Sequence, residues 1–429
     1  MNLWHHQWPA IATVLAHADR SPFYRQKYGR TSPVAPEDFQ NLPVLTRQEL
    51  YENSYPKSLA MLSCPLEGMI VTSTGGSSGL ARYTLLTHQE WLAFASVQAE
   101  AMKTLGITSR DVVANLLMAG SLWPSFIGVH DVIRIVGATH LPISANIDLD
   151  RIIRFCKEFQ PTVLLSLPTL FVFLADKALQ EGLRFPRLRM IAYAGEHMSK
   201  EAREHIGRAL GISTIKALAY TSADAGLMGY QCAHCAAGTY HLPRDFQCIE
   251  TVDPETLAPC SPEQPGEILV TNLARFSMPI IRYRIGDLAT MHGSLCPCGD
   301  PNPLFSLQGR AGEDFKLGGG YISMGVVEAA VANYCGGLGT ISLNHLLELE
   351  DRGNQMEVRL YVEAGDPEQA KAQASSLAAA LCTAIPEVQV GLDKRYIREL
   401  AVTFVPLGSL ERSPITGKVK RLNDKRVQE

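Results

Sequence analysis

The sequence predicts an α/β protein with a large N-terminal α/β domain, whose sheet is mostly parallel, and a small mobile α+β domain at the C-terminus. Between residues 88 and 220, apolar runs of strand length alternate with stretches of helical periodicity, the pattern of βαβ units. Residues 227–308 contain short strands, many prolines and paired cysteines, and predict a β-rich subdomain. A glycine triplet at 318–320 marks a hinge, so we place the domains at 1–309 and 310–429.

The first 47 residues predict helices that wrap around the large domain. Apolar residues follow helical spacing over residues 8–18, and Ser21 and Pro22 end that helix or start the next one. Thr46 and Glu49 fit a capping box, in which each side chain accepts from the other's backbone amide. A further helix is therefore expected from residue 47.

The alternating region supplies the predicted sheet. Ligands of such sheets bind beyond the carboxyl ends of the strands, so the loops at 194–196 and 220–226 are candidate binding loops. The predicted strands are 111–117, 138–143, 162–167, 189–194 and 215–220, and the predicted helices are 89–103, 129–137, 149–159, 168–180 and 200–210.

The C-terminal region predicts a smaller sheet with its own helices. The alanine-rich composition of residues 367–384 gives them high intrinsic helix propensity. The other expected elements are a helix at 323–334 and strands at 341–348, 355–362, 388–390 and 402–406.

Composition limits the classes of function. The 429 residues include 39 basic and 43 acidic side chains, a net charge of −4 that argues against nucleic-acid binding through bulk charge. The first residues carry no signal-peptide pattern, and the longest apolar stretch, 163–175, is too short to span a bilayer. We therefore expect a soluble cytoplasmic protein without nucleic-acid or membrane partners.

Residues 73–79 form the most distinctive loop of the chain, with three glycines and four hydroxyl side chains between two strand-like segments. Glycines allow close backbone approach, and free amides and hydroxyls suit a phosphate. The Walker pattern is absent, so the loop alone is equally consistent with a flexible surface hairpin. The candidate phosphate ligands are Ser73, Thr74, Gly75, Gly76, Ser77, Ser78 and Gly79.

Two cysteine pairs predict a metal site. Cys232 with Cys235, and Cys296 with Cys298, form knuckle-like pairs, and His241 lies six residues after Cys235. Thiolates clustered in this way suit a closed, structural zinc site with four ligands. Cys235, Cys296 and Cys298 are the preferred ligands, and Cys232 and His241 compete for the fourth place. The alternative is a set of reduced cysteines without metal.

An ordered set of motifs extends over nearly the whole chain. It comprises the hydroxyl-rich loop, the Arg-Tyr-Arg-Ile-Gly-Asp-Leu stretch at 282–288, Gly309-Arg310, and Ser-Pro-Ile-Thr-Gly-Lys at 413–418. In this order and spacing the set resembles the adenylate-forming superfamily of acyl-CoA synthetases. The chain looks most like the phenylacetate-CoA ligase branch, which the motifs at 23–25, 42–46 and 296–299 also resemble. Some members of that branch hold zinc in this subdomain.

The resemblance implies a two-step reaction. A carboxylic acid attacks the α-phosphate of ATP, with Mg²⁺ present, to give an acyl-adenylate and pyrophosphate, and a thiol such as that of CoA then displaces AMP. Lys418 would bridge the substrate carboxylate and the α-phosphate, and Asp224 would hold magnesium. The loop at 73–79 would bind the β- and γ-phosphates. The nucleoside would be held by Gly195, Glu196, Tyr220, Asp287 and Arg310: Tyr220 against adenine, Gly195 and Glu196 lining the base, Asp287 on the ribose hydroxyls, and Arg310 near the ribose.

Three departures from the family pattern concern the phosphates and magnesium. Leu80 stands where a lysine is usual, Ala223 replaces a threonine, and Asp224 is one methylene shorter than the usual glutamate. Three hypotheses follow. The first is a ligase joining an aromatic or arylacetic acid to CoA; the second passes the acyl group to a carrier-protein phosphopantetheine or an amine; the third is a nucleotide-binding homologue with lost or weak catalysis. A homodimer would be in keeping with this branch.

Overall fold

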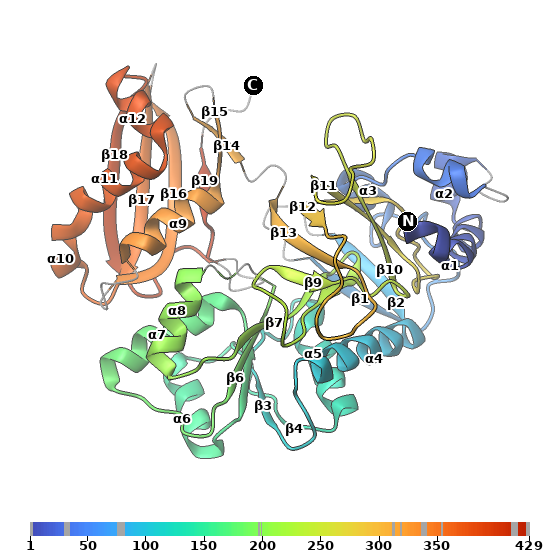
Figure 1. The fold of residues 1–429 in the computed structure, drawn as a ribbon, viewed down its shortest axis with the longest axis horizontal. Helices are drawn as coiled ribbons and strands as arrows, with labels where there is room; N and C mark the ends of the chain where they lie inside the picture. The colour runs from blue at the N-terminus through green and yellow to red at the C-terminus, as the bar shows by residue number, and fades with distance from the viewer. Residues whose placement is uncertain are drawn as a thin grey trace.

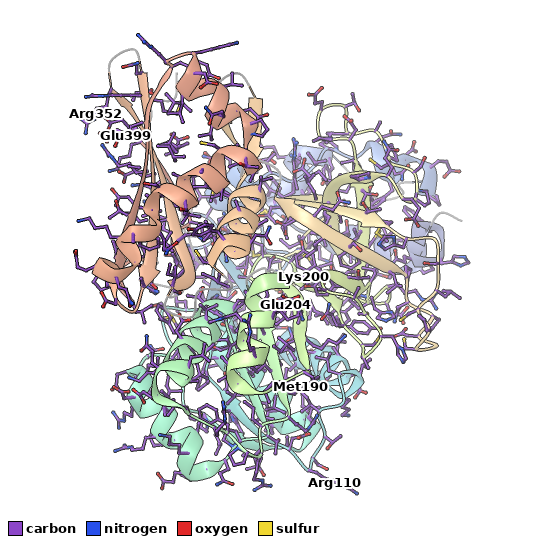
Figure 2. The ribbon with its side chains drawn as sticks, turned by 60° about the vertical axis from the view of Figure 1, so that its left-hand side comes forward. Arg110, Met190, Lys200, Glu204, Arg352 and Glu399 are labelled. Carbon is purple, nitrogen blue, oxygen red and sulfur yellow. The ribbon has the colours of Figure 1, made fainter. Side chains whose placement is uncertain are left out.

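The computed structural model describes residues 3–29, 35–74, 82–195, 198, 200–310, 314–317, 320–335, 341–352, 355–412 and 419–425. Figure 1 shows the C-terminal elements, in orange and red, gathered on one side of the molecule beside the elements of a larger sheet. Figure 2 shows the same two groups from another side, with Arg352 in the C-terminal group and Lys200 on helix α8 of the larger group.

The N-terminal helices pack against the β-rich half of the molecule, as predicted. Thr46 and Glu49 form the expected capping box at the start of α3. The Tyr24 hydroxyl donates to the carbonyl of Pro279, 2.9 Å away, and thereby joins α2 to a distant loop. The elements are α1 (Leu3–Ala18), α2 (Pro22–Tyr28), a 3-10 helix (Pro36–Asn41) and α3 (Arg47–Asn53).

The large sheet has eleven strands in the order β10-β11-β12-β13-β9-β8-β7-β6-β5-β3-β4. The pairings from β4 to β7 are parallel, as the βαβ pattern predicted, and those from β7 to β10 are antiparallel. The β-rich region predicted at 227–308 within the large domain continues the same sheet, because the chain reverses tightly between β7 and β8 and pairs back on β7.

The strands of this sheet range from three residues in β4 and β9 to nine residues in β12. They are β3 (Val112–Asn115), β4 (Thr139–Leu141), β5 (Val163–Ser166), β6 (Met190–Ala194), β7 (Ile215–Ser222), β8 (Gly226–Tyr230), β9 (Thr239–His241), β10 (Gln247–Val252), β11 (Pro265–Asn272), β12 (Tyr283–Met291) and β13 (Leu304–Arg310). A separate hairpin, β1 (Met69–Ser73) with β2 (Tyr83–Thr87), precedes them.

Helices cover both faces of the parallel half (Figure 1). Val163 and Leu165 of β5 belong to the core formed with α4 and α5, whereas Leu164 belongs to the core formed with α6, α7 and α8. Successive side chains of a strand point to opposite faces, so one apolar run builds both layers. The helices are α4 (His88–Thr104), α5 (Pro124–Val136), α6 (Leu149–Phe159), α7 (Pro168–Glu181) and α8 (Lys200–Leu210).

The C-terminal group has its own core and a four-stranded sheet in the order β18-β17-β16-β19. The predicted strand at 388–390 is wrong, because these residues lie in a helix that begins at Pro386. The valines at 388 and 390 suggested alternation, but only Val388 is buried. The elements are β14 (Asp314–Leu317), β15 (Gly320–Ser323), α9 (Met324–Cys335), β16 (Ile341–Arg352), β17 (Gln355–Ala364), α10 (Pro367–Ala370), a 3-10 turn (Lys371–Gln373), α11 (Ala374–Ala384), α12 (Pro386–Asp393), β18 (Ile397–Pro406) and β19 (Leu422–Asp424).

Among the described residues, no single helix has the length and apolar character needed to cross a membrane. The bent pair of segments Pro367–Ala384 and Pro386–Asp393, at 106° to each other, passes that test only when the two are taken together.

Candidate active site

Two side chains predicted to bind the nucleotide meet in the antiparallel half of the large sheet. The Tyr220 hydroxyl, on β7, donates a hydrogen bond to Oδ2 of Asp287 on β12, 2.5 Å away. Asp287 is paired along the β12–β13 ladder with Arg310, whose side chain lies outside the described part of the chain. The centroid of the Tyr220 ring lies 5.9 Å from the centroid of the Tyr240 ring and 6.0 Å from that of the Phe305 ring. The predicted adenine and ribose residues are thus neighbours.

Asp224 lies in the turn between β7 and β8 and is 2% exposed. Its Oδ2 accepts from Arg82, with Nη2 at 2.9 Å and Nε at 3.0 Å, and from the Tyr283 hydroxyl at 2.8 Å. Burial raises the pKa of Tyr283 well above its usual value, and Asp224 raises it further, so Tyr283 remains a donor. Oδ1 of Asp224 is buried and has no hydrogen-bond partner in the described structure. One buried carboxylate oxygen therefore lacks a hydrogen-bond partner among the described residues.

A second arginine lies behind Asp224. Arg275 is fully buried and donates to the backbone carbonyls of Asp224 and Leu85. Burial lowers the pKa of Arg275 to about 10, which leaves it charged at neutral pH. The nearby carboxylate of Glu90, which accepts from the backbone amides of Phe276 and Ser277, offsets this charge. Both Oδ2 and the backbone carbonyl of Asp224 therefore accept hydrogen bonds from largely buried donors.

The hydroxyl-rich loop leaves the β1–β2 hairpin close to Asp224. Ser73 ends β1, and Thr74 and Arg82 pair across the neck of the loop through Thr74 N to Arg82 O at 2.9 Å and Arg82 N to Thr74 Oγ1 at 3.0 Å. The neck thus fixes where the loop leaves the sheet. The predicted phosphate ligands Gly75, Gly76, Ser77, Ser78 and Gly79 lie outside the described residues.

Arg82 is a candidate that the sequence reasoning missed. The family motif drew attention to Leu80, where a lysine is usual, and suggested that the loop had lost its cation. The ion pair with Asp224 instead places a guanidinium at the neck of the loop. The available signal was a basic residue three positions after Gly79.

The other predicted ligands are only partly described. Gly195 directly follows β6 and has a positive φ of 79°, a conformation that suits glycine. Glu196 and Lys418 lie outside the described residues. Arg412 and Val419 form an antiparallel bridge that closes the segment containing Lys418. The role of Lys418 therefore stays a prediction from the sequence.

The paired cysteines meet His241 in one buried cluster. The potential ligand atoms of Cys232, His241, Cys296 and Cys298 all lie within 4.8 Å of one another. The His241 Nε2 atom is 3.4 Å from Cys232 Sγ and 3.5 Å from Cys298 Sγ. Cys235 Sγ is 3.5 Å from Cys232 Sγ but does not belong to this group of four. This group thus contains both Cys232 and His241, whereas Cys235, a preferred ligand from the sequence, lies beside it in contact with Cys232.

The surroundings of His241 fit a metal ligand. Its Nδ1 donates to the carbonyl of Asn302 at 3.3 Å, which leaves the lone pair of Nε2 directed at the thiols. The Tyr230 ring stacks on the imidazole at 5.2 Å, and the Tyr230 hydroxyl donates to Asp300. An outer partner that fixes the tautomer is typical of metal-ligating histidines. Three thiols and one imidazole suit tetrahedral Zn²⁺.

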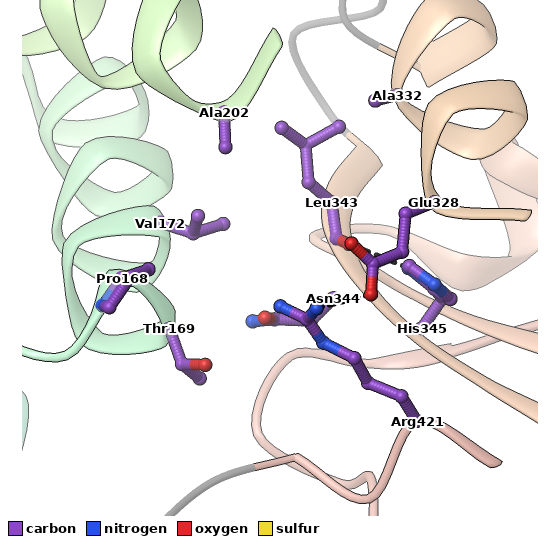
Figure 3. A pocket seen from close by; sticks show the side chains of 10 residues that line it. All are labelled: Pro168, Thr169, Val172, Ala202, Glu328, Ala332, Leu343, Asn344, His345 and Arg421. Carbon is purple, nitrogen blue, oxygen red and sulfur yellow. Dashed lines mark hydrogen bonds and ion pairs between the residues drawn. The ribbon is translucent and has the colours of Figure 1, made fainter. Parts of the chain in front are cut away.

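A small cavity of about 40 Å³ separates the two groups of elements (Figure 3). His345 is buried there; its Nδ1 donates to the Leu343 carbonyl at 2.9 Å, and its Nε2 has no hydrogen-bond partner among the described residues. This volume suits a water molecule rather than an organic acid. The lining residues are Pro168, Thr169, Val172 and Ala202 on one side and Glu328, Ala332, Leu343, Asn344, His345 and Arg421 on the other.

The comparisons with known sequences agree with one another on the family. The family model described as AMP-binding enzyme matches residues 39–276. The chain is 24% identical over 295 residues to a phenylacetate-coenzyme A ligase of Pseudomonas putida, a match covering 67% of this chain and 66% of that protein. It is 24% identical over 251 residues to an indoleacetate–lysine synthetase of Pseudomonas savastanoi, covering 58% of this chain and 55% of that one. The chain thus spans less than two thirds of these relatives.

Solved structures share the fold over nearly the whole chain. A 2-hydroxyisobutyryl-CoA ligase in its postadenylation state, in complex with 2-HIB-AMP, superposes with a TM-score of 0.81 at 21% identity, covering 97% of this chain and 88% of that one. The same ligase in its thioesterification state gives a TM-score of 0.66 at 22% identity, covering 98% and 90%. The arrangement of elements in this chain is closer to the former.

Proposed function

The chain belongs to the family of AMP-binding enzymes, and from that premise we propose that it activates a carboxylic acid with ATP and transfers the acyl group to CoA. The proposed acid is aromatic or arylacetic, because the P. putida relative is a phenylacetate-CoA ligase. The observation that carries the proposal is a pair of contacts between elements: Tyr220 on β7 bonds Asp287 on β12, and Asp224, just beyond the end of β7, pairs with Arg82 at the neck of the hydroxyl-rich loop.

The first half-reaction forms a mixed anhydride. A carboxylate oxygen of the acid attacks the α-phosphorus of ATP, and the bond from that phosphorus to the bridging oxygen of pyrophosphate breaks. Asp287 binds the ribose hydroxyls, Tyr220 holds Asp287 and faces the base, and the loop with Arg82 binds the departing phosphates. Lys418 bridges the acid and the α-phosphate as charge develops. Such catalysis depends mainly on positioning and charge stabilisation.

Asp224 is the proposed magnesium ligand. Its free Oδ1 is a suitable hard oxygen donor, and Mg²⁺ usually completes its coordination with phosphates and water. Magnesium, when bound, neutralises charge on the phosphates. Arg82 and Tyr283 hold the other carboxylate oxygen, so they orient Oδ1. Glu196 and Gly195 are proposed to line the base pocket.

A structural zinc site is part of the proposal. Cys232, His241, Cys296 and Cys298 would hold the ion with all four positions filled by protein, which leaves no position for substrate. The site would therefore stabilise the strand ends around β8, β9 and β13.

The acceptor is the open part of the proposal. Similarity to an indoleacetate–lysine synthetase supports an amine acceptor as the second candidate, and a carrier-protein thiol is a third. A homologue with weak catalysis is the remaining candidate, supported by the ion pair that occupies one oxygen of Asp224.

The proposal is tested by acid-dependent exchange between ATP and labelled pyrophosphate, with magnesium and a panel of aryl, arylacetic and aliphatic acids. Exchange with one class names the substrate, and AMP release on addition of CoA, lysine or a carrier protein names the acceptor. Asp287→Ala should abolish exchange, whereas Asp253→Ala, an exposed turn carboxylate, should leave it unchanged. Nucleotide binding without exchange for any acid would favour the weakly catalytic homologue.

A further inference from the structure

The segment before α3 is docked on the strand that carries Asp287. Leu45 is fully buried and forms a parallel bridge with Tyr283, with Leu45 N to Arg282 O at 3.0 Å and Arg284 N to Leu45 O at 2.9 Å. These bonds hold the first residues of β12. Tyr283 in turn bonds Asp224, and Asp287 follows four positions later. A segment more than 200 residues away in sequence thus contacts the backbone between two site side chains.

Arg47 continues this contact toward Asp287. Its Nη2 donates to the carbonyl of Ile285, and its Nε is buried without a partner in the described structure. The guanidinium covers Gly286, the residue directly before Asp287. A Cβ added to Gly286 would lie 3.0 Å from Cζ of Arg47 and still closer to Nη2, and Gly286 has a φ of +79°. A side chain at position 286 would therefore be strained by its φ and would displace the Arg47 guanidinium.

We propose that Arg47 is a positioning residue for the ribose carboxylate, acting through the Ile285 carbonyl and the backbone of Gly286 on Asp287. The inference rests on the proposed function, because it assumes that Asp287 binds the ribose hydroxyls. The three atoms nearest to a Cβ built on Gly286 all belong to the Arg47 guanidinium, so removing the guanidinium takes away the contact that covers this residue and lets its backbone shift. The Asp287 carboxylate would then move away from the Tyr220 hydroxyl, to which it is bonded.

The test compares the binding of ATP and 2′-deoxy-ATP by titration calorimetry in the full-length protein. If Asp287 is held in place, the wild type should prefer ATP by about tenfold, the usual effect of one lost charge-assisted hydrogen bond. Arg47→Ala should weaken ATP binding by at least the same factor, weaken 2′-deoxy-ATP less, because only its 3′-hydroxyl contact can be lost, and so abolish the preference. General destabilisation would weaken both nucleotides alike, so the ratio of the two affinities is the decisive quantity.

Two variants complete the design. Arg47→Lys keeps a charged donor for the Ile285 carbonyl and should restore part of the preference. Gln48→Ala, which removes an exposed side chain bonded only within α3, is the matched control and should keep the full preference. An Arg47→Ala protein that folds and still prefers ATP tenfold overturns the inference, as does a wild type that binds both nucleotides equally. A wild type that binds no nucleotide overturns the proposed function instead.

Discussion

Arg82 and Asp224 form an ion pair with Nη2 2.9 Å from Oδ2, although 142 residues separate them in sequence. The pair joins the neck of the hydroxyl-rich loop to the turn between β7 and β8. Both side chains are largely buried, with 15% and 2% exposure. One interaction thus couples the neck of the loop to the proposed magnesium ligand.

Replacing Arg82 should impair ATP binding. Arg82→Ala removes a donor at the neck of the proposed phosphate loop and leaves Asp224 buried without its charge partner, so affinity should fall roughly 10- to 100-fold. Arg82→Lys should lose less, because it keeps the charge but not the two-nitrogen contact. Calorimetric titration with ATP measures the effect. Arg134→Ala, from an exposed pair with Asp131, is the control, and an unchanged affinity in Arg82→Ala would remove Arg82 from the site.

Replacing Asp224 should change the magnesium requirement. Asp224→Asn keeps the shape but removes the negative charge, so the magnesium concentration giving half-maximal pyrophosphate exchange should rise by roughly tenfold or more. Saturating magnesium should recover part of the rate. A magnesium curve identical to that of the wild type would show that the ion binds elsewhere. Asp253→Asn provides the comparison, since its carboxylate is in an exposed turn.

Zinc content should distinguish Cys232 from Cys235. Cys232→Ser removes a member of the four-ligand cluster and should reduce bound zinc well below one ion per chain, measured by elemental analysis, with a lower melting temperature. Cys235→Ser, only three residues away, should keep the ion. The reverse pattern would reinstate Cys235 as a ligand. If neither change affects the metal content because the wild type binds none, the cluster consists of reduced cysteines.

Glu90 should contribute to the way the free energy of unfolding decreases at acidic pH. Burial raises the pKa of this carboxyl, but hydrogen bonds from the Ser277 hydroxyl and from the backbone amides of Ser277, Thr87 and Phe276 more than offset that effect, so the pKa lies below its usual value. A carboxyl with a depressed folded-state pKa contributes stability above its unfolded pKa, and that stability disappears as pH falls through the folded value. Glu90→Gln should therefore destabilise the protein at neutral pH and progressively less below about pH 4.5.

Chemical denaturation at several pH values measures this effect. Glu100→Gln, whose side chain is exposed and pairs only with Lys103, should run parallel to the wild type. A Glu90→Gln curve parallel to the wild type at every pH would mean that the hydrogen bonds do not stabilise the ionised form.

The Phe173 ring, on α7, should stabilise the present arrangement of the C-terminal elements relative to the large-sheet elements. The Arg412 guanidinium carbon lies 4.4 Å from the centroid of the Phe173 ring, and Arg412 also pairs with the fully buried Glu363. A contact of this kind contributes about 0.5–2 kcal/mol. Phe173→Ala should slow pyrophosphate exchange more than transfer from a preformed acyl-adenylate, because Arg412 lies next to the segment of Lys418. Phe159→Ala, on the exposed face of α6, is the control, and equal losses in both steps would contradict the prediction.

The sequence predicted correctly those features that depend on residues close together along the chain. The capping box at Thr46 and Glu49 depends on residues three apart, and the two-sided core of β5 follows from strand alternation. It could not predict the partner of Arg82, because that contact arises only when the β1–β2 hairpin packs on the β7–β8 turn. It likewise misassigned residues 388–390, where two valines fit a strand and a helix equally well.

The contact between Arg47 and Gly286 also constrains how the sequence can vary. Gly286 has a φ of +79°, so a side chain at position 286 would be strained whatever residue stands at position 47, and its Cβ would in addition displace the Arg47 guanidinium. Among relatives, glycine should therefore be kept at position 286 even where position 47 varies.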